Sequence, residues 1–254
     1  MTSTARSLRI LLLFSPDRPA LSAQEIARET GMTLSTAYRA IATLRDLGML
    51  ESYGGERFVL GGGMAMLDRV ARLTDPLRAA VFPEMQRLSA ETGLTVTMTR
   101  LYGTQLLGVD HVVGDGALSI GYERGELVPL FRGCSGKVIL SVLPWRRLKA
   151  IHAGCGAEIA AAGLGTDWQD FLEAVRGFAR QPFLWTSGEV IPENMAVAVP
   201  IRNEASGVTA SMTMILRQSV QDRFDRAMLE NRLIAAKDRA LARLAGIVDG
   251  AAGA

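Results

Sequence analysis

Near the start of the chain, apolar positions recur three and four residues apart, the spacing of helices that bury one face. The first such run covers residues 8–14 and ends before Pro16. A second run begins after Ser22, where Glu25 completes the capping box that starts a helix. Gly31 ends this run, and a third follows at once. The pattern predicts three short helices, with a tight turn between the second and the third.

The third helix opens at Thr33 or Leu34 and ends at Gly48. Two short β-prone runs follow it, and the glycine pair at 54–55 that joins them is a hairpin signal. The order helix, helix, tight turn, helix, hairpin is that of a winged helix-turn-helix, a motif that binds DNA. We therefore predict such a module over residues 1–61.

The third helix turns a polar face away from its apolar stripe of Ala37, Ile41 and Leu44, because consecutive residues turn by about 100°. Short hydroxyl side chains, an arginine and a tyrosine on the outer face suit a recognition helix in the major groove. Any solvated helix also has a polar face, but the capped helix before it and the hairpin after it favour DNA binding. The candidate DNA-binding residues are Ser22, Thr33, Ser35, Thr36, Tyr38, Arg39 and, in the wing, Arg57.

Beyond the glycines at 61–63, the pattern predicts a linker helix over residues 62–75, which Pro76 ends or bends. Its apolar stripe could be core, but between two domains it is also what a dimer seam requires, and we favour the seam. The stripe consists of Met64, Met66, Leu67 and Val70.

From Leu94 the apolar period changes to two, and hairpins are predicted with turns near residues 103–104 and 203–207. On each hairpin, hydroxyl side chains share one face. We expect these faces to meet water, which is their commoner fate. If the sheet is covered on both sides, they would instead line a polar cavity. The hydroxyl residues are Thr95, Thr97, Thr99, Thr209, Ser211 and Thr213.

Helices are predicted between the two hairpins, around residues 136–152 and 167–180. A long helix is predicted to start near Ser219, where Asp222 completes another capping box. A flexible Gly/Ala tail at 250–254 closes the chain.

The composition is that of a soluble globular protein, with 48% hydrophobic and 21% charged residues. The net charge is +2, and residues 1–60 carry seven arginines against six acidic groups, so a single module should bind DNA weakly and need a dimer. The two cysteines and two histidines show no zinc-ligand spacing, and we expect no metal and no cofactor. The apolar run at 10–14 is too short to span a bilayer, so we expect a cytoplasmic protein without a membrane partner.

Three stretches, in order along the chain, resemble the IclR family of bacterial transcriptional regulators. They are "LSAQEIARETGMTLSTAYRAIATLRDLGMLESYGGERFVLG" at 21–61, "GELVPLFRGCSGKVILSVLP" at 125–144 and "GEVIPENMAVAVP" at 188–200. The resemblance implies an α+β chain with an N-terminal winged helix-turn-helix, a linker helix and a C-terminal GAF-like α/β domain over 76–249. In that family the last domain binds a small, often acidic or aromatic, metabolite and mediates dimer or tetramer assembly.

The chain also departs from the family pattern. Phe131 and Arg132 stand where small residues or His are usual, and Glu193 occupies the usual Gly. Ala196 stands where many members carry a Cys or Ser that contacts the effector. These departures mean that the identity of the effector is not safely carried over from any relative.

Small residues precede a helix that is predicted to begin near Lys137, and free N–H groups at a helix N-terminus bind carboxylates well. A plain helix cap is the alternative, and the resemblance favours a ligand pocket. Glu189 is placed at the pocket mouth or, equally, in an exposed loop. Cys134 has no His, Asn or Asp nearby in sequence to activate it, so packing is favoured over catalysis. The candidate effector-binding residues are Gly133, Cys134, Ser135, Glu189, Ala196 and Ser211.

These observations predict a transcriptional regulator whose affinity for double-stranded operator DNA is controlled by a small organic acid. We expect a homodimer or tetramer that is not an enzyme. Because Ala196 makes part of the pocket apolar, a carboxylate with a hydrophobic body is favoured. The main alternative is a small-molecule enzyme with an accessory winged helix; a weaker one is a winged-helix module that binds proteins.

Overall fold

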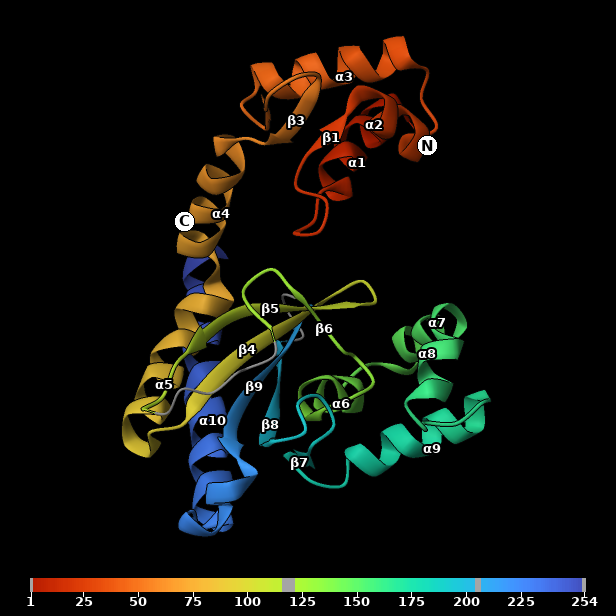
Figure 1. Cartoon of the computed structure of the whole chain (residues 1–254). Helices are drawn as coiled ribbons and strands as arrows, with labels where there is room; N and C mark the ends of the chain where they lie inside the picture. The colour runs from red at the N-terminus through yellow and green to blue at the C-terminus, as the bar shows by residue number, and fades with distance from the viewer. Residues whose placement is uncertain (1, 116–121, 204–206, 253–254) are drawn as a thin grey trace. The chain divides into compact units, whose positions relative to one another are not determined.

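The computed structural model describes residues 2–115, 122–203 and 207–252, and these divide into two compact units, Met1–Asp75 and Pro76–Ala254. Figure 1 shows helices and a small sheet in the first unit, and a larger sheet covered by helices in the second. This mixed content confirms the predicted α+β class. Of the predicted tail, residues 250–252 are helical, and 253–254 lie outside the described residues.

The first unit is built around a small three-stranded sheet of order β1-β3-β2. Its core contains Ile10, Leu21, Ile26, Ile41 and Leu50, all almost fully buried. The elements are α1 (Ser3–Arg9), the 3₁₀ helix η1 (Ile10–Leu13), β1 (Leu21–Ser22), α2 (Ala23–Thr30), α3 (Leu34–Asp46), β2 (Leu50–Ser52), β3 (Arg57–Leu60) and α4 (Gly62–Thr74).

Local signals set most of these boundaries. Ser22 Oγ accepts a hydrogen bond from Glu25 N at 3.2 Å, and Ser22 N donates to the Glu25 carboxylate at 2.7 Å, so the predicted capping box is confirmed. The first helix was wrongly placed over residues 8–14. It begins at Ser3 because the Thr2 side chain caps it, and the chain then tightens into η1 before Pro16.

The second unit has an antiparallel six-stranded sheet of order β6-β5-β4-β9-β8-β7. Helices α5 and α10 cover its apolar face, and α6 packs on the other face, with α7–α9 on that side (Figure 1). The elements are α5 (Pro76–Thr92), β4 (Thr95–Tyr102), β5 (Gln105–Val112), β6 (Leu127–Val128), α6 (Cys134–Ser141), α7 (Trp145–Gly154), α8 (Gly156–Ala161), α9 (Trp168–Phe178), β7 (Leu184–Ser187), β8 (Asn194–Asn203), β9 (Val208–Arg217), the 3₁₀ helix η2 (Gln218–Arg223) and α10 (Arg226–Ala252).

Both predicted hairpins are present, as β4–β5 and β8–β9, although residues 204–206 of the second turn lie outside the described residues. The predicted helix at 136–152 is two helices, α6 and α7, because Pro144 removes a backbone donor and ends the first. The closing helix begins at Arg226 rather than near Ser219. Its cap is Asp225, whose carboxylate accepts from Ala227 N at 2.9 Å.

Our expectation that the hydroxyl faces of the hairpins meet water was wrong: five of the six hydroxyl residues are buried, and Thr209 is half-buried. Thr97 and Thr99 on β4 are fully buried, as is Ser211 on β9. The sheet is covered on both sides, so each buried hydroxyl needs a partner. Thr99 bonds Ser211 at 2.7 Å, and Thr97 bonds the Tyr122 hydroxyl at 2.8 Å. The alternative was that these hydroxyls line a polar cavity. Thr213 does line one, whereas Thr99 and Ser211 pair with each other inside the sheet.

Candidate functional site

The N-terminal end of α3 carries a connected group of hydroxyls, which we call the α3 hydroxyl cluster: Thr33, Ser35 and Thr36. Thr33 Oγ1 accepts from Thr36 N at 3.3 Å and therefore caps the helix. The same oxygen lies 2.8 Å from Thr36 Oγ1 and 3.4 Å from Ser35 Oγ. Arg39 Nη2 donates to Thr36 Oγ1 at 3.5 Å. The cluster and Arg39 thus form one outward-facing polar network in the N-terminal half of α3, and such a network suits a recognition helix.

Of the three remaining candidate DNA-binding residues, Tyr38 is exposed on α3, whereas Ser22 and Arg57 lie apart from this network on the small sheet. Ser22 and Arg57 are register partners across β1 and β3. The Ser22 hydroxyl and N–H both engage Glu25, and the Arg57 guanidinium donates to the carbonyl of Ala20 and lies 3.6 Å from Glu25. Arg57 therefore contacts residues of its own unit and helps to hold β1 and β3 together. At the wing, Tyr53 is exposed, with 65% of its surface accessible.

Leu34 was not among the candidates, although it is exposed beside the cluster. It lies one turn before Tyr38, and the two side chains are 42% and 39% exposed. A leucine on an outward face can contact a thymine methyl group. The helical spacing of the two residues was the signal that could have identified it.

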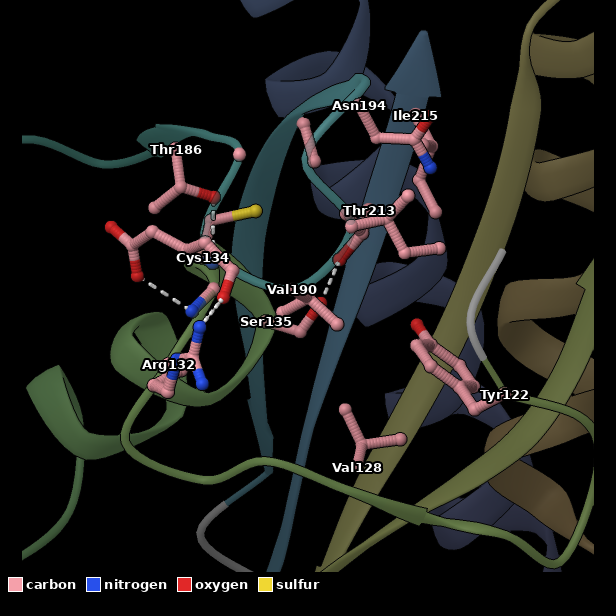
Figure 2. A pocket seen from close by; sticks show the side chains of 15 residues that line it. Tyr122, Val128, Arg132, Cys134, Ser135, Thr186, Val190, Asn194, Thr213 and Ile215 are labelled. Carbon is pink, nitrogen blue, oxygen red and sulfur yellow. Dashed lines mark hydrogen bonds between the residues drawn. The ribbon is translucent and has the colours of Figure 1, made fainter. Parts of the chain in front are cut away.

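In the second unit, the first turn of α6 faces strands β7, β8 and β9 across a small cavity, which we call the effector cavity. Its volume is about 50 Å³. Figure 2 shows its lining side chains. The lining residues are Tyr122, Val128, Arg132, Gly133, Cys134, Ser135, Thr186, Gly188, Glu189, Val190, Ile191, Asn194, Ala196, Thr213 and Ile215.

Helix α6 begins at Cys134, three residues earlier than predicted, because Gly133 serves as its N-cap. Gly133 has φ +77°, a left-handed conformation that favours glycine, and a Cβ there would lie 2.8 Å from Val190 Cγ2. The first turn therefore consists of the small residues that were expected to leave N–H groups free for a ligand.

Two of the N–H groups at the start of α6 already donate to side chains of this chain. Gly133 N donates to Glu189 Oε2 at 2.8 Å, and Cys134 N donates to Thr186 Oγ1 at 3.1 Å. Lys137 Nζ contacts both carboxylate oxygens of Glu189, at 2.7 and 2.6 Å. Glu189 thus occupies the favourable anion position at the start of α6, where we had expected the effector.

Hydroxyl groups line the inner part of the cavity. Ser135 Oγ lies 2.9 Å from Thr213 Oγ1, and the Tyr122 hydroxyl bonds Thr97. Burial raises the pKa of Tyr122 to about 12, so its hydroxyl stays protonated at neutral pH and can act as donor. Ala196 and Ile215 add apolar wall.

Five of the six candidate effector residues line this cavity. The exception is Ser211, which bonds Thr99 deeper in the sheet. Sequence reasoning missed Thr186 and Tyr122, for which no local pattern exists. Arg132 was noticed only as a departure from the family pattern.

The structure also bears on the alternative of an enzyme that uses Cys134. This thiol is 2% exposed, and burial raises its pKa to about 12, so it is protonated and a poor nucleophile at neutral pH. Within the described ranges, no three His, Cys, Asp or Glu side chains gather as a metal site would require. Among the residues that the structure describes, no helix is long and apolar enough to cross a membrane.

We expect iodoacetamide at about pH 8 to alkylate Cys155 and spare Cys134 in the folded chain, because Cys155 is only half-buried. Peptide mapping by mass spectrometry measures both sites, and unfolding in urea should make them react alike. Equal labelling of the two cysteines without urea would contradict the burial of Cys134.

Comparison with known proteins gives two matches to family descriptions. Residues 3–53 match the IclR helix-turn-helix domain, and residues 72–241 match the family described as bacterial transcriptional regulator IclR C-terminal. The chain is 23% identical over 217 residues to the HTH-type transcriptional regulator KipR of Bacillus subtilis, with 84% of each chain covered.

Solved structures show the same fold. An IclR family transcriptional regulator from Brucella abortus aligns with a TM-score of 0.75 at 24% identity, covering 94% of this chain and 91% of that one. An IclR homolog from Microbacterium hydrocarbonoxydans, complexed with 4-hydroxybenzoate, aligns with a TM-score of 0.73 at 21% identity, covering 96% of this chain and 100% of that one.

Proposed function

The chain belongs to the IclR family of bacterial transcriptional regulators, and we propose that a small organic acid in the effector cavity controls its affinity for operator DNA. The observation that carries this proposal is the cavity itself, which combines charged, hydroxyl and apolar walls within the region that matches the family's C-terminal domain. The similar protein from Microbacterium hydrocarbonoxydans, complexed with 4-hydroxybenzoate, supports an acid as the class of ligand. We place this activity in the bacterial cytoplasm.

We assign DNA recognition to α3, with Ser35, Tyr38 and Arg39 toward base edges and Thr33 and Thr36 holding the network in place. We regard Ser22 and Arg57 as weaker candidates for direct contact with DNA, because their polar groups already bind Glu25. A phosphate contact by Arg57 remains part of the proposal for the wing.

The proposal is tested by measuring DNA binding and acid binding on the same protein. DNA that the chain selects from a random library is titrated by fluorescence anisotropy, with and without organic acids that raise the melting temperature. Linkage requires that an acid which changes DNA affinity by some factor changes its own affinity by the same factor when DNA is bound. Consumption of the acid, or an unchanged DNA affinity with acid bound, would contradict the proposal.

We also propose that α4 assembles a second copy. Met66, Leu67, Val70 and Leu73 are each more than half exposed, and α4 buries no residue within its unit. Met66, Val70 and Leu73 are four and three residues apart and therefore share one face of the helix, which suits packing against a second helix. Such an apolar surface is costly to leave in water.

We expect a dimer or larger species at micromolar concentration in reductant, and Val70→Glu should shift it toward monomer. Light scattering measures the mass. The matched control is Arg72→Gln, which changes the charge by the same amount on the opposite side of α4. A wild-type monomer, or equal effects of both substitutions, would contradict the seam.

A further inference from the structure

The effector cavity has two charged side chains in its lining, Arg132 and Glu189. Lys137, which is not part of the lining, forms an ion pair with Glu189, and the Lys137 side chain is 13% exposed. Both oxygens of Glu189 lie within 2.7 Å of the Lys137 ammonium, and one also accepts from Gly133 N. The anion and this cation therefore satisfy each other. Because Glu189 balances the charge of Lys137, the positive charge of Arg132 is left without a balancing carboxylate among these three residues.

Arg132 differs from Lys137 in what it contacts. Its guanidinium donates to the backbone carbonyl of Glu189, which is an uncharged acceptor. A guanidinium carries several N–H donors in a planar fork that matches a carboxylate, so one hydrogen bond does not exhaust it. The side chain is exposed at the cavity rim, where an anion can reach it.

The far wall of the cavity offers a different chemistry. Figure 2 shows Arg132 and Tyr122 on opposite sides of the Ser135–Thr213 pair. These hydroxyls both donate and accept hydrogen bonds, and Val190 and Ala196 supply apolar wall near them. A ligand that satisfies the lining needs an anionic end, a short apolar body and a hydroxyl end.

We propose that Arg132 binds the effector's carboxylate, and that the effector is a hydroxylated monocarboxylate whose hydroxyl reaches Ser135, Thr213 or Tyr122. This inference rests on the proposed effector control. It moves the acid from the start of α6, which Glu189 fills, to the cavity rim. Displacing Glu189 instead would break its three hydrogen bonds and replace one carboxylate by another with no gain in charge balance.

The volume constrains the body of the ligand. A cavity of about 50 Å³ holds a few water molecules and is smaller than the roughly 150 Å³ that accommodates benzene. A compact hydroxy acid therefore needs less movement of the lining than an aromatic acid does. An aromatic acid requires Val190 and Ile191, in the segment between β7 and β8, to move outward. Probes of both sizes are therefore needed.

The test uses the full chain with 4-hydroxybutyrate and 4-hydroxybenzoate as acids, and 4-hydroxybutanamide and 4-hydroxybenzamide as neutral isosteres. Calorimetry and thermal shift measure binding to wild type, Arg132→Gln, Arg132→Lys and Glu189→Gln. We expect at least one acid to bind wild type about ten- to hundredfold more tightly than its amide, the range of a charge-assisted contact. Arg132→Gln should abolish that preference while changing amide affinity less than about twofold, and Arg132→Lys should retain part of it.

Each outcome decides the proposal. An acid preference that survives in Arg132→Gln overturns it, and a gain in acid affinity in Glu189→Gln would then place the carboxylate at the start of α6. If no probe binds wild type, the assignment of a hydroxylated monocarboxylate to Arg132 fails, while the proposed effector control is decided separately by the titration of DNA with and without organic acids that raise the melting temperature. If binding depends on Arg132 but DNA affinity stays constant, the assignment stands and the proposed control fails.

Discussion

Replacing Gly136 by alanine is expected to destabilise the Pro76–Ala254 unit by about 3 kcal/mol, the upper range for an overpacked core. Gly136 lies in the first turn of α6, and a Cβ there would be 2.1 Å from Leu130 O and 2.6 Å from Leu130 C. The obstacle is backbone, so no side chain can rotate to relieve it. The segment before α6, or α6 itself, must shift, and both border the effector cavity.

Urea unfolding followed by tryptophan fluorescence measures this effect, because all three tryptophans, Trp145, Trp168 and Trp185, lie in the second unit. The matched control is Gly177→Ala in α9, where a Cβ meets nothing within 4 Å. In that helix, alanine should stabilise by roughly 0.5–1 kcal/mol. The same substitution is thus expected to have opposite signs at two helical glycines. A loss at Gly136 below about 1 kcal/mol would mean that α6 packs less closely than described.

The organisation of the first unit was predictable because its signals are local. Ser22 and Glu25 are three residues apart, and one glycine ends α2. Local signals also explain the errors. Ser219 followed by Asp222 has the form of a capping box, but the chain forms a 3₁₀ turn there, and Asp225 supplies the cap instead.

The candidate effector site was predictable only in part, because its decisive contacts are long-range. Small residues at the start of α6 indicated a helix N-terminus able to hold an anion. The anion there is Glu189, which contacts Lys137 although the two residues are 52 positions apart in the sequence. Likewise, strand alternation showed that Thr213 shares a face with other hydroxyls, but whether that face is buried depends on α6 packing over it.

Arg39→Ala is expected to weaken binding to the selected operator by roughly 5- to 150-fold, the range of one good base contact, while changing binding to random DNA much less. Arg39 lies on the outward face of α3, and its guanidinium is oriented by Thr36, which Thr33 holds in turn. A guanidinium that a neighbouring hydroxyl orients is better placed to discriminate between bases, whereas a mobile arginine mainly attracts phosphate.

The two roles differ in how binding depends on salt. Loss of a phosphate contact lowers the salt slope and weakens all sequences alike, whereas loss of a base contact narrows the ratio of operator to random affinity. The matched control is Arg28→Ala on α2, which removes the same charge from a side chain that is 73% exposed. Thr36→Val should reproduce part of the Arg39 effect, because it removes the hydroxyl that orients the guanidinium without removing charge. If Arg39→Ala and Arg28→Ala lower operator and random binding equally, α3 does not read bases through Arg39.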